Sequence, residues 1–164
     1  MIVIADASPL NYLVLIGHVD VLHQMYGRVV VPAGVLRELT APGAPSSVQA
    51  WMNATPDWVE VRHVDVPADS GLDALDEGEA EAIFLAERLR PSVLLIIDDR
   101  DGRREAARRG FATTGTLGVI RDASGRGLID LVTALDRLGR TTFRVSPALL
   151  KELLERERGR PGES

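Results

Sequence analysis

Short apolar runs alternate with helical patterns along this chain. Runs rich in β-branched residues at 2–5 and 29–31 predict strands, and the continuous apolar run at 93–97 is typical of a parallel strand buried on both faces. An extended segment at 59–64 and a short one at 111–113 predict two weaker strands. Because strands and helices alternate, we expect an α/β fold with a doubly wound, mostly parallel sheet flanked by helices.

Start and stop signals divide the helical part of the sequence. Ser8 is expected to cap the first helix with Pro9 at its first position, and Gly17 is expected to end it. Further helices are predicted at 19–26, 32–39, 48–54, 76–90, 102–109, 116–123, 128–138 and 147–156.

Length and composition then narrow the class of protein. The 164 residues fit one domain at 1–157, made of a core at 1–130 and additional C-terminal helices at 131–157, ahead of a flexible tail at 158–164. The absence of cysteine excludes disulfides, thiolate nucleophiles and cysteine zinc sites. The N-terminal sequence and the absence of a long apolar run lead us to expect a cytoplasmic protein with no membrane partner.

Acidic residues follow two of the predicted strands directly. Asp6 ends the first run, and Asp98 and Asp99 end the buried one. Ligand sites of open parallel sheets form beyond the carboxyl ends of the strands, so these acids are candidates for one site. The alternative is that each acid merely caps the helix that follows it.

Helical spacing selects two more candidates. Glu79 has alanine, isoleucine and alanine at i+3, i+4 and i+7, which places it at the upper end of an apolar face. Glu81 lies on a mixed face, and Asp76 and Glu77 sit where acids simply favour a helix N-terminus. Glu38 follows apolar positions in the helix after 29–31. Its alternative is a surface glutamate paired with a nearby arginine.

Carboxylates that converge repel one another unless they bind protons or a cation. The single lysine, Lys151, is far along the chain, and the three histidines lie away from the acids. Hard oxygen ligands without histidine or cysteine select Mg²⁺ or Mn²⁺. A net charge of −5 is compatible with such a site, because bound cations neutralise the carboxylates.

Four segments of the chain carry a resemblance to a known family. They are IVIADASPL at the N-terminus, GEAEAI at 78–83, LLIIDDRDGR at 94–103 and TGTLGV at 114–119. In this order and over about residues 1–130, the chain resembles the PIN domains, and more closely their VapC-like ribonuclease branch in bacteria and archaea.

The resemblance implies a metal-dependent endoribonuclease that uses Mg²⁺ or Mn²⁺, and the toxin of a toxin–antitoxin pair is one such protein. It assigns catalysis to Asp6, Glu38, Glu79, Asp98 and Asp99, and metal binding to the same set without Glu38. Ser8, Thr114 and Thr116 are implied as supporting residues. Which of Asp98 and Asp99 binds the metal is left open.

Partners are expected from the same interpretation. RNA is the expected substrate, and Arg100, Arg103 and Arg104 are candidates for contacts with its phosphates. The alternative for these arginines is a solvated helix face paired with its own acids. An antitoxin protein and a homodimer are also expected.

The sequence fits three other classes of function less well than a nuclease. A catalytically degenerate PIN-like module acting through protein binding is the main alternative. A receiver domain needs a lysine after a late strand, and Lys151 is in the wrong place. A phosphatase of the haloacid-dehalogenase type needs an aspartate where Ser8 stands.

Overall fold

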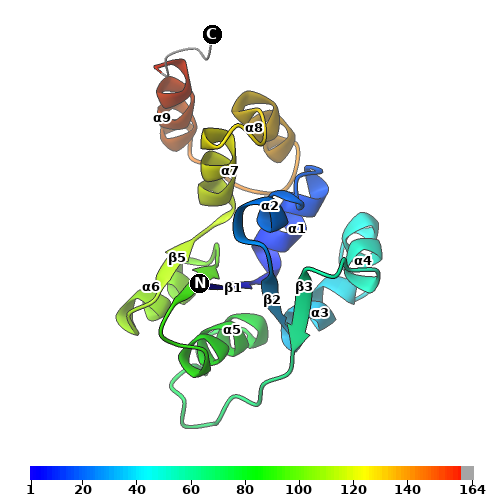
Figure 1. The fold of residues 1–164 in the computed structure, drawn as a ribbon, viewed down its shortest axis with the longest axis vertical. Helices are drawn as coiled ribbons and strands as arrows, with labels where there is room; N and C mark the ends of the chain where they lie inside the picture. The colour runs from blue at the N-terminus through cyan, green and yellow to red at the C-terminus, as the bar shows by residue number, and fades with distance from the viewer. Residues whose placement is uncertain (160–164) are drawn as a thin grey trace.

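A sheet of parallel strands runs through the middle of the molecule (Figure 1). The computed structural model describes residues 1–159, and within them the sheet has five strands. These are β1 (Ile2–Ala5), β2 (Val29–Pro32), β3 (Val59–Arg62), β4 (Val93–Ile96) and β5 (Ala112–Thr114). Their order is β3-β2-β1-β4-β5, and every neighbouring pair is parallel. The predicted α/β, doubly wound architecture is confirmed.

Helices cover both faces of this sheet (Figure 1). They are α1 (Ala7–Leu15), α2 (Val21–Tyr26), α3 (Ala33–Thr40), α4 (Ser46–Asn53), α5 (Glu77–Arg88), α6 (Arg100–Arg108), α7 (Thr116–Gly125), α8 (Leu131–Gly139) and α9 (Pro147–Arg158). The last two are the additional C-terminal helices that the sequence predicts. Of the tail expected at 158–164, Arg158 still belongs to α9, and residues 160–164 lie outside the described part.

Alternating side chains of each strand supply two hydrophobic cores, because successive residues of a strand point to opposite faces. Val3 and Ala5 pack with apolar side chains of α1 to α4 and α7 to α9. Ile4 lies in the other core, with side chains from α5 and α6. One face therefore carries a thick layer of helices, and the other carries α5 and α6.

The start of α1 differs from the prediction. The helix begins at Ala7, and Asp6 occupies the capping position with a side chain that makes no cap hydrogen bond. The expected Ser8 cap is wrong, since the Ser8 hydroxyl donates instead to Asp98. Pro9 fits the first turn because a nitrogen there has no partner within the helix. At the carboxyl end of β1, one oxygen of the Asp6 carboxylate, Oδ1, is thereby left without a hydrogen-bond partner among the described residues.

Strand order places the first acids next to each other. The chain leaves β1 toward β2 and β3 and later returns to β4 on the other side of β1. This reversal is the switch point at which open α/β sheets form their sites. Asp6 follows β1 and Asp98 follows β4 closely, so both side chains lie at that point.

The length and polarity of a helix determine whether it could cross a membrane. Within residues 1–159, no helix is both long and apolar enough to cross a bilayer.

Candidate functional site

Asp6 is the most deeply buried acid at the carboxyl edge of the sheet. Its residue is 4% exposed, and within the described part of the chain its Oδ1 atom has no hydrogen-bond partner. Burial raises the pKa of this carboxyl to about 7, and the negative charges of Asp76, Glu38 and Asp98 raise it further. The backbone amide of Ala7 acts in the opposite direction. No cationic side chain among the described residues offsets the negative charge of this buried carboxylate.

Glu79 brings a second buried carboxylate to the same place. It lies in the first turn of α5 and is 7% exposed. Burial raises its pKa to about 8, with further contributions from the charges of Asp76, Asp6 and Asp99. Gly78 allows this close approach, because a Cβ atom there would lie 3.2 Å from Asp6 Oδ1. Two buried acids thus share one region, and the charge of Asp6 opposes ionisation of Glu79.

Asp98 differs from both because hydrogen bonds hold it in place. Its Oδ1 accepts from the backbone N–H of Thr116 at 2.7 Å, and its Oδ2 accepts from Thr116 Oγ1 at 2.6 Å and from Ser8 Oγ at 2.7 Å. Gly115 leaves room for this carboxylate, since a Cβ there would lie 2.7 Å from Asp98 Oδ1. The segment after β5 therefore fastens Asp98 at the edge of the sheet.

The two threonines expected as supporting residues are placed differently. Thr116 contacts Asp98 twice, as just described. Thr114 instead packs its side chain over Gly118, where a Cβ atom would collide with the Thr114 hydroxyl. Thr114 contributes to the sheet through its backbone carbonyl, which accepts from Ile97 N–H at 2.8 Å. The structure does not bring its side chain to an acid.

Two exposed acids complete the cluster, and each also caps a helix. Asp76 Oδ1 accepts from Glu79 N–H at 2.8 Å at the start of α5, and Asp99 Oδ2 accepts from Gly102 N–H at 2.9 Å at the start of α6. One oxygen of Asp99 therefore caps the following helix, which is the alternative given above for an acid that follows a strand. Both acids still raise the pKa of Glu79. Sequence reasoning missed Asp76 as a member of the cluster; its position three residues before Glu79 was the available signal.

Glu38 lies at the rim of the cluster and not on a buried face. The expectation of an inward position is wrong, because Glu38 is exposed on α3. None of the ion pairs found among residues 1–159 includes Glu38, so it is not paired with an arginine there either. Partial burial and the charge of Asp76 raise its pKa. A cavity of about 370 Å³ between α3 and α5 is lined by both residues, so Glu38 faces the acids across a gap.

The arginines at the start and at the end of α6 are placed differently. Arg100, Arg103 and Arg104 are exposed at the start of α6 and form no ion pair within the described residues. Arg103 lies beside Asp98, since a Cβ atom at Gly115 would lie 3.4 Å from Arg103 Nη1 and 2.7 Å from Asp98 Oδ1. Further along, Arg108 and Arg109 pair with Glu105, as the alternative reading of this helix face expects.

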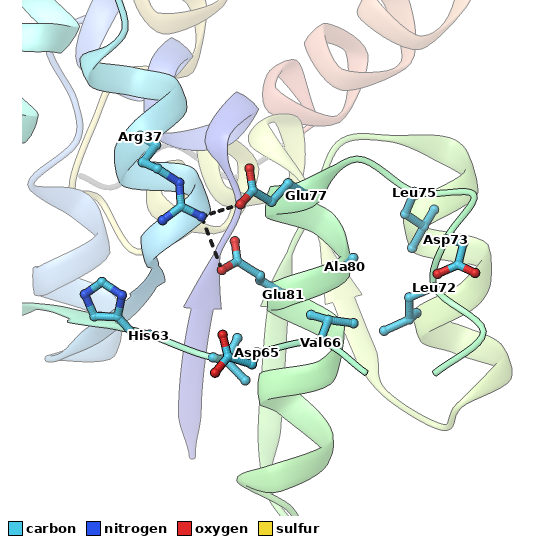
Figure 2. A pocket seen from close by; sticks show the side chains of 11 residues that line it. Arg37, His63, Asp65, Val66, Leu72, Asp73, Leu75, Glu77, Ala80 and Glu81 are labelled. Atoms are coloured by element: carbon cyan, nitrogen blue, oxygen red, sulfur yellow. Dashed lines mark hydrogen bonds and ion pairs between the residues drawn. The ribbon is translucent and has the colours of Figure 1, made fainter. Parts of the chain in front are cut away.

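A buried acid outside the cluster was not anticipated. Glu81 is 5% exposed, although its sequence neighbours had placed it on a mixed face. Figure 2 shows Arg37 of α3 reaching to both Glu77 and Glu81 of α5; the Glu81 contact measures 3.7 Å. Gly34 makes room, because a Cβ there would collide with the Glu81 carboxylate. This contact joins α3 to α5 beside the acid cluster.

The donor set of the cluster suits a hard divalent cation. Within the described residues, no three acidic or histidine side chains already stand as ligands of one ion. Both oxygens of Asp98 accept hydrogen bonds, and one oxygen each of Asp76 and Asp99 accepts the hydrogen bond of a helix cap. The unpartnered Asp6 oxygen and the shared repulsion with Glu79 are what a cation would relieve.

Comparison with known proteins adds one finding. A family model described as a PIN domain matches residues 2–158, which is nearly the whole chain. No curated protein and no solved structure matches the chain.

Proposed function

The chain belongs to the PIN-domain family, and on that premise we propose that it is a metal-dependent endoribonuclease. PIN domains are generally nucleases and typically use divalent metals, so the proposal adds the substrate and the residues. Asp6, Glu79 and the Asp98–Asp99 pair would hold Mg²⁺ or Mn²⁺. Glu38 would act from the rim, because it is exposed and faces Asp76 across a gap.

The observation that carries this proposal is the pair of buried carboxylates. Asp6 and Glu79 are both more than nine-tenths buried, and burial together with the negative charges of neighbouring acids raises their pKa values to about 7 and about 8. A buried charge without a partner is costly, so a fold keeps such a pair only with a compensating gain. Binding of a hard cation supplies that gain.

Each residue around the pair has a distinct part in the proposed reaction. Mg²⁺ or Mn²⁺ supplies Lewis acidity toward the scissile phosphate and an attacking water when it is bound. Ser8 and Thr116 keep Asp98 in one orientation through the hydrogen bonds described above. Arg103 lies next to Asp98 and has no ion pair within the described part of the chain, and it would bind a phosphate oxygen of the substrate.

The test is Asp6→Asn, which keeps the size of the side chain and removes its charge. We expect cleavage of single-stranded RNA to fall by at least about 100-fold, the scale on which a central catalytic group acts. Circular dichroism should show an unchanged fold. Wild-type cleavage should stop in EDTA and return with Mn²⁺; cleavage that persists in EDTA contradicts the proposal.

The same protein can be used to test the degenerate alternative. Calorimetric titration with Mn²⁺ should give a binding signal for the wild type and a much weaker one for Asp6→Asn. A wild-type protein that gives no heat with Mn²⁺ and cleaves no RNA would favour a protein-binding module.

A toxin role, an antitoxin partner, a homodimer and a cytoplasmic location remain part of the proposal. An antitoxin would place an arginine or an apolar segment against the acidic crevice. The informative observations are whether the neighbouring reading frame encodes a small DNA-binding protein, and the mass of the purified protein in solution.

A further inference from the structure

We propose that a pocket beside the acid cluster binds one base of a single-stranded RNA, next to the phosphate held at the acids; this rests on the proposed function. The pocket, named here the Tyr12 pocket, has a volume of about 430 Å³. It lies between α1 and α3, with Ser8, Asn11, Tyr12 and Glu38 on its walls and the 41–45 loop closing one side.

Two of its residues connect the Tyr12 pocket to the acids. Ser8 lines the pocket and donates to Asp98 Oδ2 at 2.7 Å. Glu38 lines the pocket and also lines the cavity that contains Asp76. A phosphate bound at the acids would therefore have the pocket as a neighbour, within reach of the base of an adjoining nucleotide.

The chemistry of the walls suits an uncharged aromatic ring. Most of the lining is apolar, and the volume falls within the range of about 300–1,000 Å³ found for small-molecule sites. Among the described residues on its walls, Glu38 is the only charged one, and a carboxylate repels a phosphate group. A base is the part of a nucleotide that such a pocket accepts.

Tyr12 is held as a fixed wall. Its hydroxyl lies 2.8 Å from Thr142 Oγ1, and its ring meets the Phe143 ring edge to face at 4.9 Å between centroids. The opposite loop is also fastened, since Gln49 Nε2 donates to the Ala44 carbonyl at 2.7 Å. Bases of unpaired RNA stack on rigid aromatic side chains of this kind.

Asn11 supplies the polar group that could distinguish one base from another. Its side chain is half-buried on the wall and makes no hydrogen bond to any part of the chain that the structure describes. A free amide carries both donors and an acceptor, which allows it to pair with the edge of a base. Tyr12 would thus give affinity and Asn11 would give selectivity.

The experiment compares cleavage of short single-stranded RNAs that differ only in the nucleotides flanking the cut. We expect the wild type in Mn²⁺ to prefer one base by roughly 5-fold to 100-fold, the range for one paired base edge. Asn11→Ala should flatten that preference. The matched control is Asn53→Ala at the exposed far end of α4, which should keep the wild-type preference. An unchanged preference in Asn11→Ala overturns the proposal.

A second pair of variants tests stacking. Tyr12→Leu should raise KM by roughly ten-fold or more, because a stacked base is lost. Tyr12→Phe keeps the ring and should keep a KM near that of the wild type. Equal KM values for Tyr12→Leu and the wild type would remove the pocket from substrate binding.

Binding without cleavage separates failure of the pocket from failure of the proposed function. Fluorescence anisotropy with labelled five-nucleotide RNAs is measured on Asp6→Asn and on the double variant Asp6→Asn with Asn11→Ala. A base preference in the first protein that is lost in the second supports the pocket, even if the wild type cleaves no RNA. Binding without any base preference, or no binding, overturns the pocket inference even where the wild type is an active nuclease.

Discussion

Asp6 occupies the N-terminal capping position of α1, but its carboxylate does not accept the capping hydrogen bond. Asp76 and Asp99 occupy the same position on their own helices, and each accepts the cap hydrogen bond. A missing cap costs about 1 kcal/mol of stability. Asp6 lacks this stabilisation and stays buried, with its Oδ1 atom unpartnered among residues 1–159. This agrees with a carboxylate that serves binding and not folding.

Gly115 offers a test of how Asp98 is held. A Cβ atom at this position would lie 2.7 Å from Asp98 Oδ1 and 3.4 Å from the Ile97 carbonyl oxygen. Gly115→Ala should therefore displace Asp98, destabilise the fold by about 1–3 kcal/mol and lower cleavage. Chemical denaturation and cleavage rates measure the two effects.

The matched control for that substitution is Gly139→Ala. A Cβ atom at Gly139 would meet no atom within 4 Å. Its stability should change by less than about 0.5 kcal/mol. Equal behaviour of the two alanine variants would show that Asp98 is not held as described.

The sequence predicted correctly that some of the acidic side chains are buried, but it was wrong about others for physical reasons. Asp6 and Glu79 stand out because strand ends and helical stripes are local patterns. Glu38 was expected inward, yet α3 turns that position toward the rim. Glu81 is buried because α3 approaches it at Gly34, a contact between residues far apart in the sequence. Local periodicity carries no information about that contact.

The packing of α3 against α5 sets the position of Glu38, at the rim, relative to the acid cluster. Arg37 of α3 joins Glu77 and Glu81 of α5, and its neighbour Glu38 faces Asp76. The Glu81 carboxylate is buried, and its Oε2 atom has no hydrogen-bond partner among the residues that the structure describes. Burial raises its pKa, while Arg37 lowers it. The arginine thus makes an otherwise unfavourable buried charge tolerable.

Arg37→Ala should destabilise the protein more at pH 8 than at pH 5. Because burial raises the pKa of Glu81, a larger fraction of this carboxyl is protonated at pH 5 than at pH 8, and only the ionised form suffers from the loss of the Arg37 counter-charge. The expected loss at pH 8 is about 1–3 kcal/mol by chemical denaturation. Adding Glu81→Gln should recover most of it.

A control for this pair exists on α8. Arg140 pairs with Asp136 on the surface, with the two side chains 79% and 61% exposed. Arg140→Ala should cost less than about 1 kcal/mol at either pH. A loss in Arg37→Ala that does not depend on pH would contradict the role given to Glu81.

Over the whole molecule, the buried acids link stability to pH and to metal. Folding raises the pKa of Asp6 from 3.8 to about 7 and that of Glu79 from 4.5 to about 8. Their protonated forms therefore favour the folded state. This contribution is fully present below the ordinary pKa values and is lost as the pH rises through 7 and 8.

We expect the Tm in EDTA to fall as the pH rises from 5 to 8. Mn²⁺ should raise the Tm more at pH 8 than at pH 5, because the ion competes with protons for the same oxygens. Asp6→Asn should show a smaller fall with pH and a smaller response to Mn²⁺. Differential scanning calorimetry gives the Tm, and a Tm in EDTA that rises over this range would contradict the argument.

The arrangement of the whole sheet was predictable only in part. Alternating strands and helices identify a doubly wound fold, and the two acids after strands identify its working edge. The order of the strands could not be predicted in this way, because it depends on which buried faces pack together over the whole chain. The pairing of β1 with β4 brings Asp6 near Asp98, and no local signal in the sequence encodes that pairing.

Four helices begin at the edge where the acids meet, namely α1, α5, α6 and α7. The first amides of each helix carry partial positive charge, so the backbone itself contributes attraction for anions there. Side-chain substitutions leave these amides in the chain. A protein disabled at one carboxylate would keep this part of its affinity for a polyanion, and it would behave as a trap that holds a strand without cutting it.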